Sequence, residues 1–124
     1  MRSLFAVFLV LHGIAHGVGF TGSWRLGPSR DAPLATTLLG GRLDVGVMGI
    51  RATGVVWLLT GLAFVVAAVG VWRNADWWPA LTMGVAVLSL VMSVLAWPEA
   101  RIGVALNLVI LVGLWASGRL TALQ

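Results

Sequence analysis

ATGVVWLLTGLAFVVAAVGVW, the stretch at residues 52–72, contains no charged side chain and no proline. A helix rises 1.5 Å per residue, so a run of this length crosses the roughly 30 Å hydrocarbon core of a bilayer. Backbone groups in lipid need hydrogen-bond partners within the protein, and the stretch lacks the alternation typical of barrel strands. It therefore predicts a transmembrane α-helix.

Three further apolar segments of similar length lie on either side of this one, separated by short groups of charged, glycine and proline residues. We therefore expect an all-α integral membrane fold, with one domain over residues 1–124 that forms a four-transmembrane-helix bundle. The expected spans are about 3–22, 44–72, 77–97 and 99–118.

Composition supports a membrane environment and excludes several other classes. Hydrophobic residues make up 60% of the chain, charged residues only 10%, and the mean hydropathy is +1.01, whereas a soluble domain carries about 25% charged residues. The net charge of +4 comes from arginines at the ends of the spans. Nucleic-acid binding would instead need a clustered basic patch. We expect the bilayer to be the main partner and no nucleic acid to bind.

Topology follows from the number of spans and the position of the arginines. Four spans put both termini on the same side of the membrane. Arg2, Arg73 and Arg119 lie on that side, and a slightly larger group lies on the other. The positive-inside rule therefore favours termini outside the cell.

The longest connection between spans, residues 21–42, is rich in glycine and proline. Ser29 or Asp31 is a suitable cap for a short interfacial helix that Gly40 would end. Long connections in compact bundles are often functional. The segment is either a plain connector or a lid over a cavity between helices.

Two histidines in the first span are the main candidate site residues. His12 and His16 are four residues apart and therefore share a helix face, and Asn107 in the last span is a suitable polar partner for them. Polar side chains within a membrane are costly and often functional. We expect all three to face the bundle interior, as a ligand or proton site or as interhelical hydrogen bonds that fix helix pairing.

The sequence does not identify a cofactor, and a quinone and a haem are the two candidates. Two histidines one helical turn apart can share a metal ion, but most sites need a third ligand. The chain has no third histidine and no cysteine, so a metal at His12 and His16 would need a carboxylate or a second protomer. Haem b subunits usually take their axial histidines from two helices, whereas both histidines here share one.

A second group of candidates lies at the start of the second span. Asp44 and Arg51 are two helical turns apart, so they share a face if the helix begins near Asp44. They would form either an interfacial pair or a polar vestibule for an anionic or carbonyl-bearing ligand.

Four glycines are expected to bring helices into close contact. Gly13 and Gly17 form a small-residue pair in the first span, and Gly54 and Gly61 lie in the second. Small residues at this kind of spacing allow backbones of membrane helices to approach each other.

The first helix resembles the opening of the DoxX-like family of small four-span bacterial membrane proteins. The resemblance rests on RSL at residues 2–4, an apolar run, and LHGIAH at residues 11–16, where His16 takes the position of a basic residue that is usually lysine. ARIGVALN at residues 100–107 is similar to the family's last helix. The family has links to quinol oxidation and to membrane-associated redox complexes.

The resemblance implies a membrane accessory subunit of a respiratory or redox assembly, one that holds a quinone-like or other small lipophilic ligand near His12, His16 and Asn107. We expect the protein to form a homo-oligomer or to join other membrane subunits, and to have no catalytic activity of its own. The alternatives are a small oligomeric channel or transporter and a purely structural membrane subunit.

Overall fold

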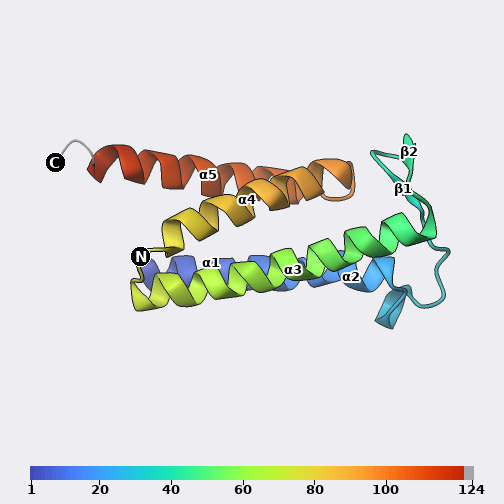
Figure 1. Cartoon of the computed structure of the whole chain (residues 1–124), viewed down its shortest axis with the longest axis horizontal. Coiled ribbons are helices and arrows are strands. Elements are labelled where there is room, and N and C mark those ends of the chain that lie inside the picture. The colour runs from blue at the N-terminus through green and yellow to red at the C-terminus, as the bar shows by residue number, and fades with distance from the viewer. Residues whose placement is uncertain (122–124) are drawn as a thin grey trace.

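The computed structural model describes residues 1–121, and it is predominantly helical (Figure 1). The elements in chain order are α1 (Arg2–Ala15), α2 (Gly17–Ser23), the short 3₁₀ helix η1 (Gly27–Ser29), β1 (Thr37–Leu38), β2 (Leu43–Asp44), α3 (Gly46–Arg73), α4 (Trp78–Leu95) and α5 (Arg101–Thr121).

Four helical segments within residues 1–121 are long and apolar enough to cross a membrane. They are Arg2–Ser23, Gly46–Arg73, Trp78–Leu95 and Arg101–Gly118. These bounds agree with the predicted spans to within about two residues at most ends. The last helix begins at Arg101 rather than near residue 99, because Pro98 and Glu99 belong to the turn between α4 and α5.

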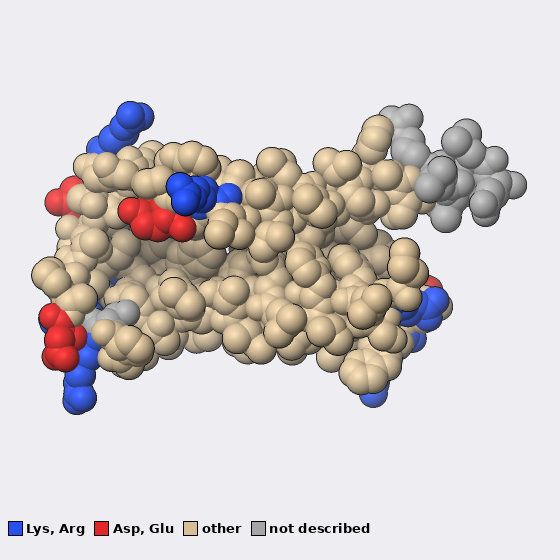
Figure 2. Space-filling model, turned by 180° about the vertical axis from the view of Figure 1, so that it is seen from behind, with Lys and Arg blue, Asp and Glu red and all other residues tan. Residues whose placement is uncertain are grey.

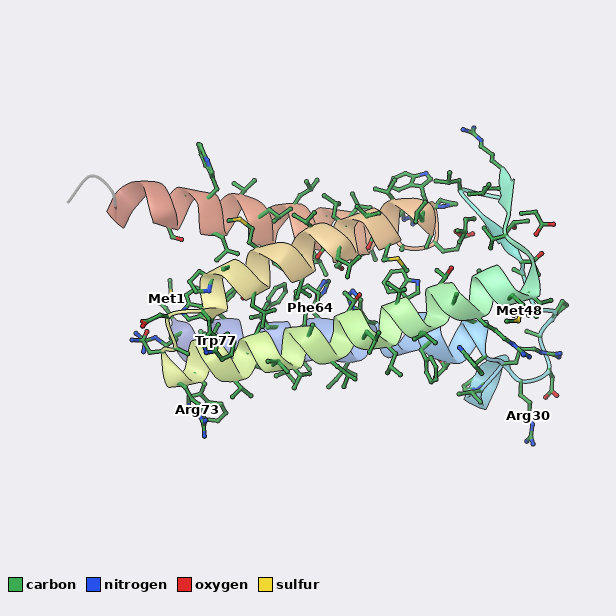
Figure 3. The ribbon with its side chains drawn as sticks, viewed as in Figure 1. Met1, Arg30, Met48, Phe64, Arg73 and Trp77 are labelled. Atoms are coloured by element: carbon green, nitrogen blue, oxygen red, sulfur yellow. The ribbon has the colours of Figure 1, made fainter. Side chains whose placement is uncertain are left out.

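Charged side chains gather at the two ends of the molecule, and the view in Figure 2 shows a broad uncharged belt between them. Arg73 and Trp77 lie at one end, and Arg30 and Met48 lie at the other (Figure 3). The beginning of α1 and the end of α5 lie at the same end (Figure 1). This distribution is typical of a bundle whose middle faces hydrocarbon.

Helix α3 holds the bundle together, since it packs against α1, α2 and α4, while α5 packs against α4. Phe64 of α3 is completely buried and points into the middle of the molecule (Figure 3). Leu9 of α1, Ala86 of α4 and Ile110 of α5 belong to the same hydrophobic core.

The first span is interrupted at His16, which separates α1 from α2. The His16 N–H donates to the Gly13 carbonyl at 3.2 Å, and the His16 carbonyl accepts from the Gly19 N–H at 3.1 Å. Hydrogen bonds between residues three apart are those of a 3₁₀ helix, in which each residue rotates the chain by about 120° about the helix axis, against about 100° in an α-helix. Residues after the interruption therefore leave the face on which Gly13 lies.

This interruption explains why the prediction for Gly17 was wrong while those for Gly13 and Gly61 are confirmed. A Cβ on Gly13 would lie 2.6 Å from the Gly61 carbonyl oxygen, so α1 and α3 touch backbone to backbone there. A Cβ on Gly17 would have no neighbour within 4 Å. Gly19, which the sequence did not single out, contacts the Trp57 ring instead.

Gly54 also makes the expected close contact, although with α2. A Cβ at this position would lie 2.6 Å from the Cβ of Ser23. The Ser23 hydroxyl donates to the Gly19 carbonyl at 2.7 Å and is thereby turned back onto its own helix. Small side chains on both sides therefore bring α2 against the first half of α3.

The interfacial helix expected in the connection is absent from the described chain. The segment instead contains η1 and an antiparallel pair of two-residue strands, in which Thr37 pairs with Asp44 and Leu38 with Leu43. Leu39, Gly40 and Gly41 all have positive φ, a left-handed conformation that a helix cannot contain. They form the tight turn of the hairpin β1–β2.

The hairpin is attached to the bundle at its tip. The Leu39 N–H donates to the carbonyl of Leu95, the last residue of α4, at 2.8 Å. Leu38 is buried. The connection therefore folds over the end of the bundle rather than extending away from it.

Candidate functional site

A closed ring of hydrogen bonds links α1, α4 and α5 in the interior of the bundle. His12 Nε2 lies 3.3 Å from Asn107 Oδ1, and Asn107 Nδ2 lies 2.7 Å from the Ser89 hydroxyl oxygen. That oxygen lies 2.8 Å from His16 Nε2, and His16 Nδ1 lies 2.8 Å from the His12 carbonyl oxygen. The structure therefore unites the two predicted histidines, the predicted asparagine and Ser89.

Backbone carbonyls determine which atoms of the ring donate. Asn107 Nδ2 also donates to the Gly103 carbonyl at 2.8 Å, and a carbonyl only accepts. The amide orientation is thereby set, and Asn107 Oδ1 must accept from a protonated Nε2 of His12. In the same way His16 Nδ1 donates to a carbonyl, so in the neutral imidazole Nε2 accepts the Ser89 hydroxyl hydrogen. The two histidines hold opposite tautomers.

Aromatic rings hold the two imidazoles in these positions. The Phe8 ring stacks on His12 at a centroid distance of 5.9 Å, and the Phe64 ring meets it edge-on at 4.7 Å. Trp57 contacts His16 at 5.0 Å. The four residues of the hydrogen-bonded ring are at least nine-tenths buried, and Asn107 and Ser89 are fully buried. The site is therefore closely packed and buried on most sides.

A cavity of about 890 Å³ extends from the two histidines toward the hairpin end of the bundle. Its walls come from α2, the first half of α3, the end of α4 and the start of α5, together with residues 32–35 and 37–41 of the connection. Most of the lining is apolar. The polar or titratable lining side chains are His12, His16, Ser23, Arg25, Thr37, Thr53, Ser93 and Glu99.

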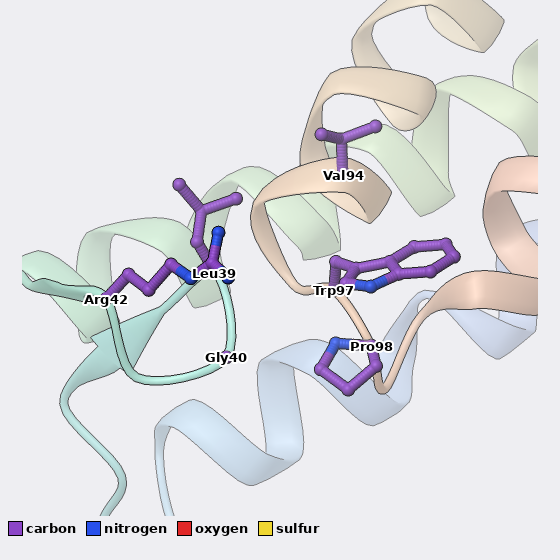
Figure 4. Close-up of a pocket in the computed structure, with 6 residues that line it drawn as sticks. All are labelled: Leu39, Gly40, Arg42, Val94, Trp97 and Pro98. Atoms are coloured by element: carbon purple, nitrogen blue, oxygen red, sulfur yellow. The ribbon is translucent and has the colours of Figure 1, made fainter.

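A second cavity of about 450 Å³ lies on the other side of the hairpin tip. Figure 4 shows Leu39, Gly40 and Arg42 of the hairpin facing Val94, Trp97 and Pro98. Leu39 and Gly40 line both cavities, so the two cavities adjoin at the hairpin tip.

Asp44 and Arg51, the predicted vestibule, line neither cavity. Asp44 is exposed at the end of β2 and accepts the Gly46 N–H at 2.9 Å, where α3 begins. Arg51 is exposed, with its guanidinium 5.4 Å from the centre of the Trp24 ring. Asp44 precedes the helix, so the two residues do not share a helix face.

Arg25 and Glu99 are the charged residues that line the larger cavity, and neither was predicted as a site residue. They lie at the end of α2 and in the turn before α5, 74 positions apart in the chain. The one feature of the sequence that could have pointed to Glu99 as a site residue is that it is the only glutamate in the chain. Only the fold brings the two positions to one cavity.

The arrangement of the histidines is unfavourable for a metal ion or a haem. Both nitrogens of His16 and one of His12 already have hydrogen-bond partners. Among residues 1–121 no group of three His, Cys, Asp or Glu side chains is able to hold a metal ion. The site fits a ligand held by packing and a hydrogen bond better than one held by coordination.

The fold and the site thus define a bundle of four apolar helices with a buried polar network at the inner end of a largely apolar cavity. A comparison with models of protein families, with curated proteins and with solved structures finds no match. The resemblance to DoxX-like proteins, and the function it implies, remain predictions.

Proposed function

We propose that this chain is an integral membrane protein that holds a quinone-like or other small lipophilic ligand in the 890 Å³ cavity, as a DoxX-like accessory subunit of a respiratory or redox assembly. Its four helices would cross the bilayer with both termini outside the cell. Four apolar helices, and charges confined to the ends of the bundle, support the membrane location.

The cavity itself carries the proposal for ligand binding. Ligand sites are typically concave, about 300–1,000 Å³ in volume, mostly apolar and provided with a few polar groups that orient the ligand. The cavity meets each of these conditions, with His12 and His16 at its inner end. The Trp57 ring adds a flat aromatic surface beside His16.

Two glycines of α2 provide a matched test of ligand binding. Gly22 lines the cavity, Gly17 does not, and a Cβ at either position would have no neighbour within 4 Å. The first carbon of a leucine side chain therefore has room at both positions, and a leucine takes up cavity space at position 22 but not at position 17. The probe is decylubiquinone, and its binding to detergent-solubilised protein is followed by quenching of Trp57 fluorescence.

We expect saturable quenching in the wild type and in Gly17→Leu, and its loss in Gly22→Leu. A Trp57→Phe variant supplies the background from the other tryptophans. Equal binding by both glycine variants would place the ligand outside this cavity and contradict the proposal.

The accessory role is tested by purification from native membranes in mild detergent. Redox subunits that co-purify with the chain support it. A lone homodimer that dissipates an ion gradient in liposomes would instead support the small channel or transporter and contradict the accessory role.

A further inference from the structure

We propose that the cavity selects a lipophilic molecule with a hydrogen-bond donor at its buried end, a phenol or quinol, over the corresponding carbonyl or ether compound. The inference rests on the proposed ligand-binding function and specifies the chemistry of its ligand. It starts from Nδ1 of His12, the one ring nitrogen of the two histidines that has no partner in the described chain.

This nitrogen belongs to a residue that lines the cavity, and it is not fully buried. Every fully buried polar side-chain atom in the described part of the chain has a hydrogen-bond partner. His12 Nδ1 has none, so it retains some accessible surface although the residue is only 6% exposed. His12 lines the cavity.

The same nitrogen is a hydrogen-bond acceptor. The Gly103 carbonyl sets the orientation of the Asn107 amide, and Asn107 Oδ1 in turn requires the proton of His12 on Nε2. A neutral imidazole carries one N–H, so Nδ1 presents a lone pair to the cavity. A hydroxyl donates to this lone pair, whereas a quinone carbonyl or an ether oxygen meets it with a second lone pair.

The Ser93 hydroxyl also lines the cavity, and it does not reverse this preference. Its hydroxyl both donates and accepts, so it accommodates a hydroxyl as well as a carbonyl. His16 offers neither nitrogen, because both belong to the closed ring. At the buried end of the cavity, beside the two histidines, it is therefore His12 that sets the preference.

The test uses two probes with the same octyl chain and ring, 4-octylphenol and 4-octylanisole, in which a methyl group replaces the hydroxyl hydrogen and so removes the donor. Binding to the detergent-solubilised full chain is measured by titration calorimetry. The Gly22→Leu variant, in which a leucine takes up cavity space, supplies the background for partition of each probe into detergent.

We expect the phenol to bind about fivefold more tightly than the ether, the factor that corresponds to one net hydrogen bond. Ser93→Ala should keep this preference and His12→Phe, which retains a ring but no nitrogen, should abolish it. Equal affinities in the wild type, or a preference that survives His12→Phe, would overturn the inference and leave the proposed function intact. Absence of specific binding by either probe would overturn both.

Nitrogen-15 NMR of histidine-labelled wild-type protein provides a readout that needs no His12 variant. We expect His12 to be protonated on Nε2 and His16 on Nδ1, with the His12 Nδ1 resonance shifting on addition of the phenol and not of the ether. A proton on Nδ1 of His12 in the free protein would overturn the inference directly.

Discussion

Gly13 of α1 and Gly61 of α3 face each other so closely that a Cβ on either would lie within 2.6 Å of the other's carbonyl oxygen. This reciprocal contact fixes the distance between the two helices. It also places His16 against α3, because a Cβ on Gly61 would lie 3.1 Å from that of His16. The contact between the two helices and the closed ring of hydrogen bonds are therefore parts of one arrangement.

Gly13→Ala should destabilise the protein by about 1–3 kcal/mol, the usual cost of adding a methyl group to a packed interior. The obstacle is a backbone oxygen, which moves only if the two helices separate. Thermal melting of the detergent-solubilised protein measures the effect. Gly17→Ala is the control on the neighbouring helix and should leave the melting temperature unchanged. Equal melting temperatures for the two variants would show that the Gly13 contact is unimportant.

The hydrogen bond between His12 and Asn107 in the closed ring predicts that the two residues are energetically coupled. In a double-mutant cycle of His12→Phe and Asn107→Leu, the double variant should be more stable than the sum of the single changes implies, by about 0.5–2 kcal/mol. Each single change leaves a buried polar group without its partner, and the double change removes both groups. Unfolding in a mixed-micelle titration gives the four free energies. Additive values would mean that the hydrogen bond contributes nothing.

The hairpin turn depends on glycine at position 41, which has a φ of +89°. Gly41→Val should strain the turn by at least about 1–2 kcal/mol, since side chains disfavour the left-handed region, while a Cβ there meets no neighbour. The Leu39 N–H should then exchange faster with solvent, because its bond to the Leu95 carbonyl opens more often. Gly84→Val is the control, since Gly84 lies in helix α4 with equally open space around it. Unchanged exchange at Leu39 would separate the turn from the attachment of the hairpin.

Asp44 predicts a pH dependence at the start of α3. The Gly46 N–H donates a hydrogen bond to this carboxylate and is the main cause that lowers its pKa below the ordinary value. A hydrogen bond from the Thr36 side chain lowers the pKa further. Because the folded-state pKa is the lower one, the stabilisation is complete above the ordinary pKa of an aspartate and is lost as the pH falls through the lowered value.

An NMR titration of the Asp44 carboxyl carbon should therefore show a midpoint below that of an unstructured aspartate. Over the same range, the Gly46 amide should lose protection from exchange after correction for the intrinsic rate. In Asp44→Asn, which retains an acceptor oxygen but does not titrate, Gly46 protection should not change with pH. An ordinary midpoint for Asp44 would contradict the hydrogen bonds assigned to it.

The sequence by itself determined the helices, because apolar length is a local property. The run at residues 52–72 has a single physical solution in hydrocarbon, a helix, and α3 extends over Gly46–Arg73. The four-residue spacing also placed His12 and His16 on one face, and the scarcity of polar groups within the spans pointed to Asn107 as their partner.

Only the tertiary structure decided which surfaces meet. Ser89 was not predicted as a site residue, yet its hydroxyl joins His16, 73 positions before it in the chain, to Asn107, 18 positions after it. Gly19 replaced Gly17 in helix packing because the interruption at His16 changed the helical phase. Arg25 and Glu99 came to one cavity through the path of the connection and the turn before α5. Such contacts depend on the relative rotation and separation of helices, which many side chains set together and no single stretch of sequence encodes.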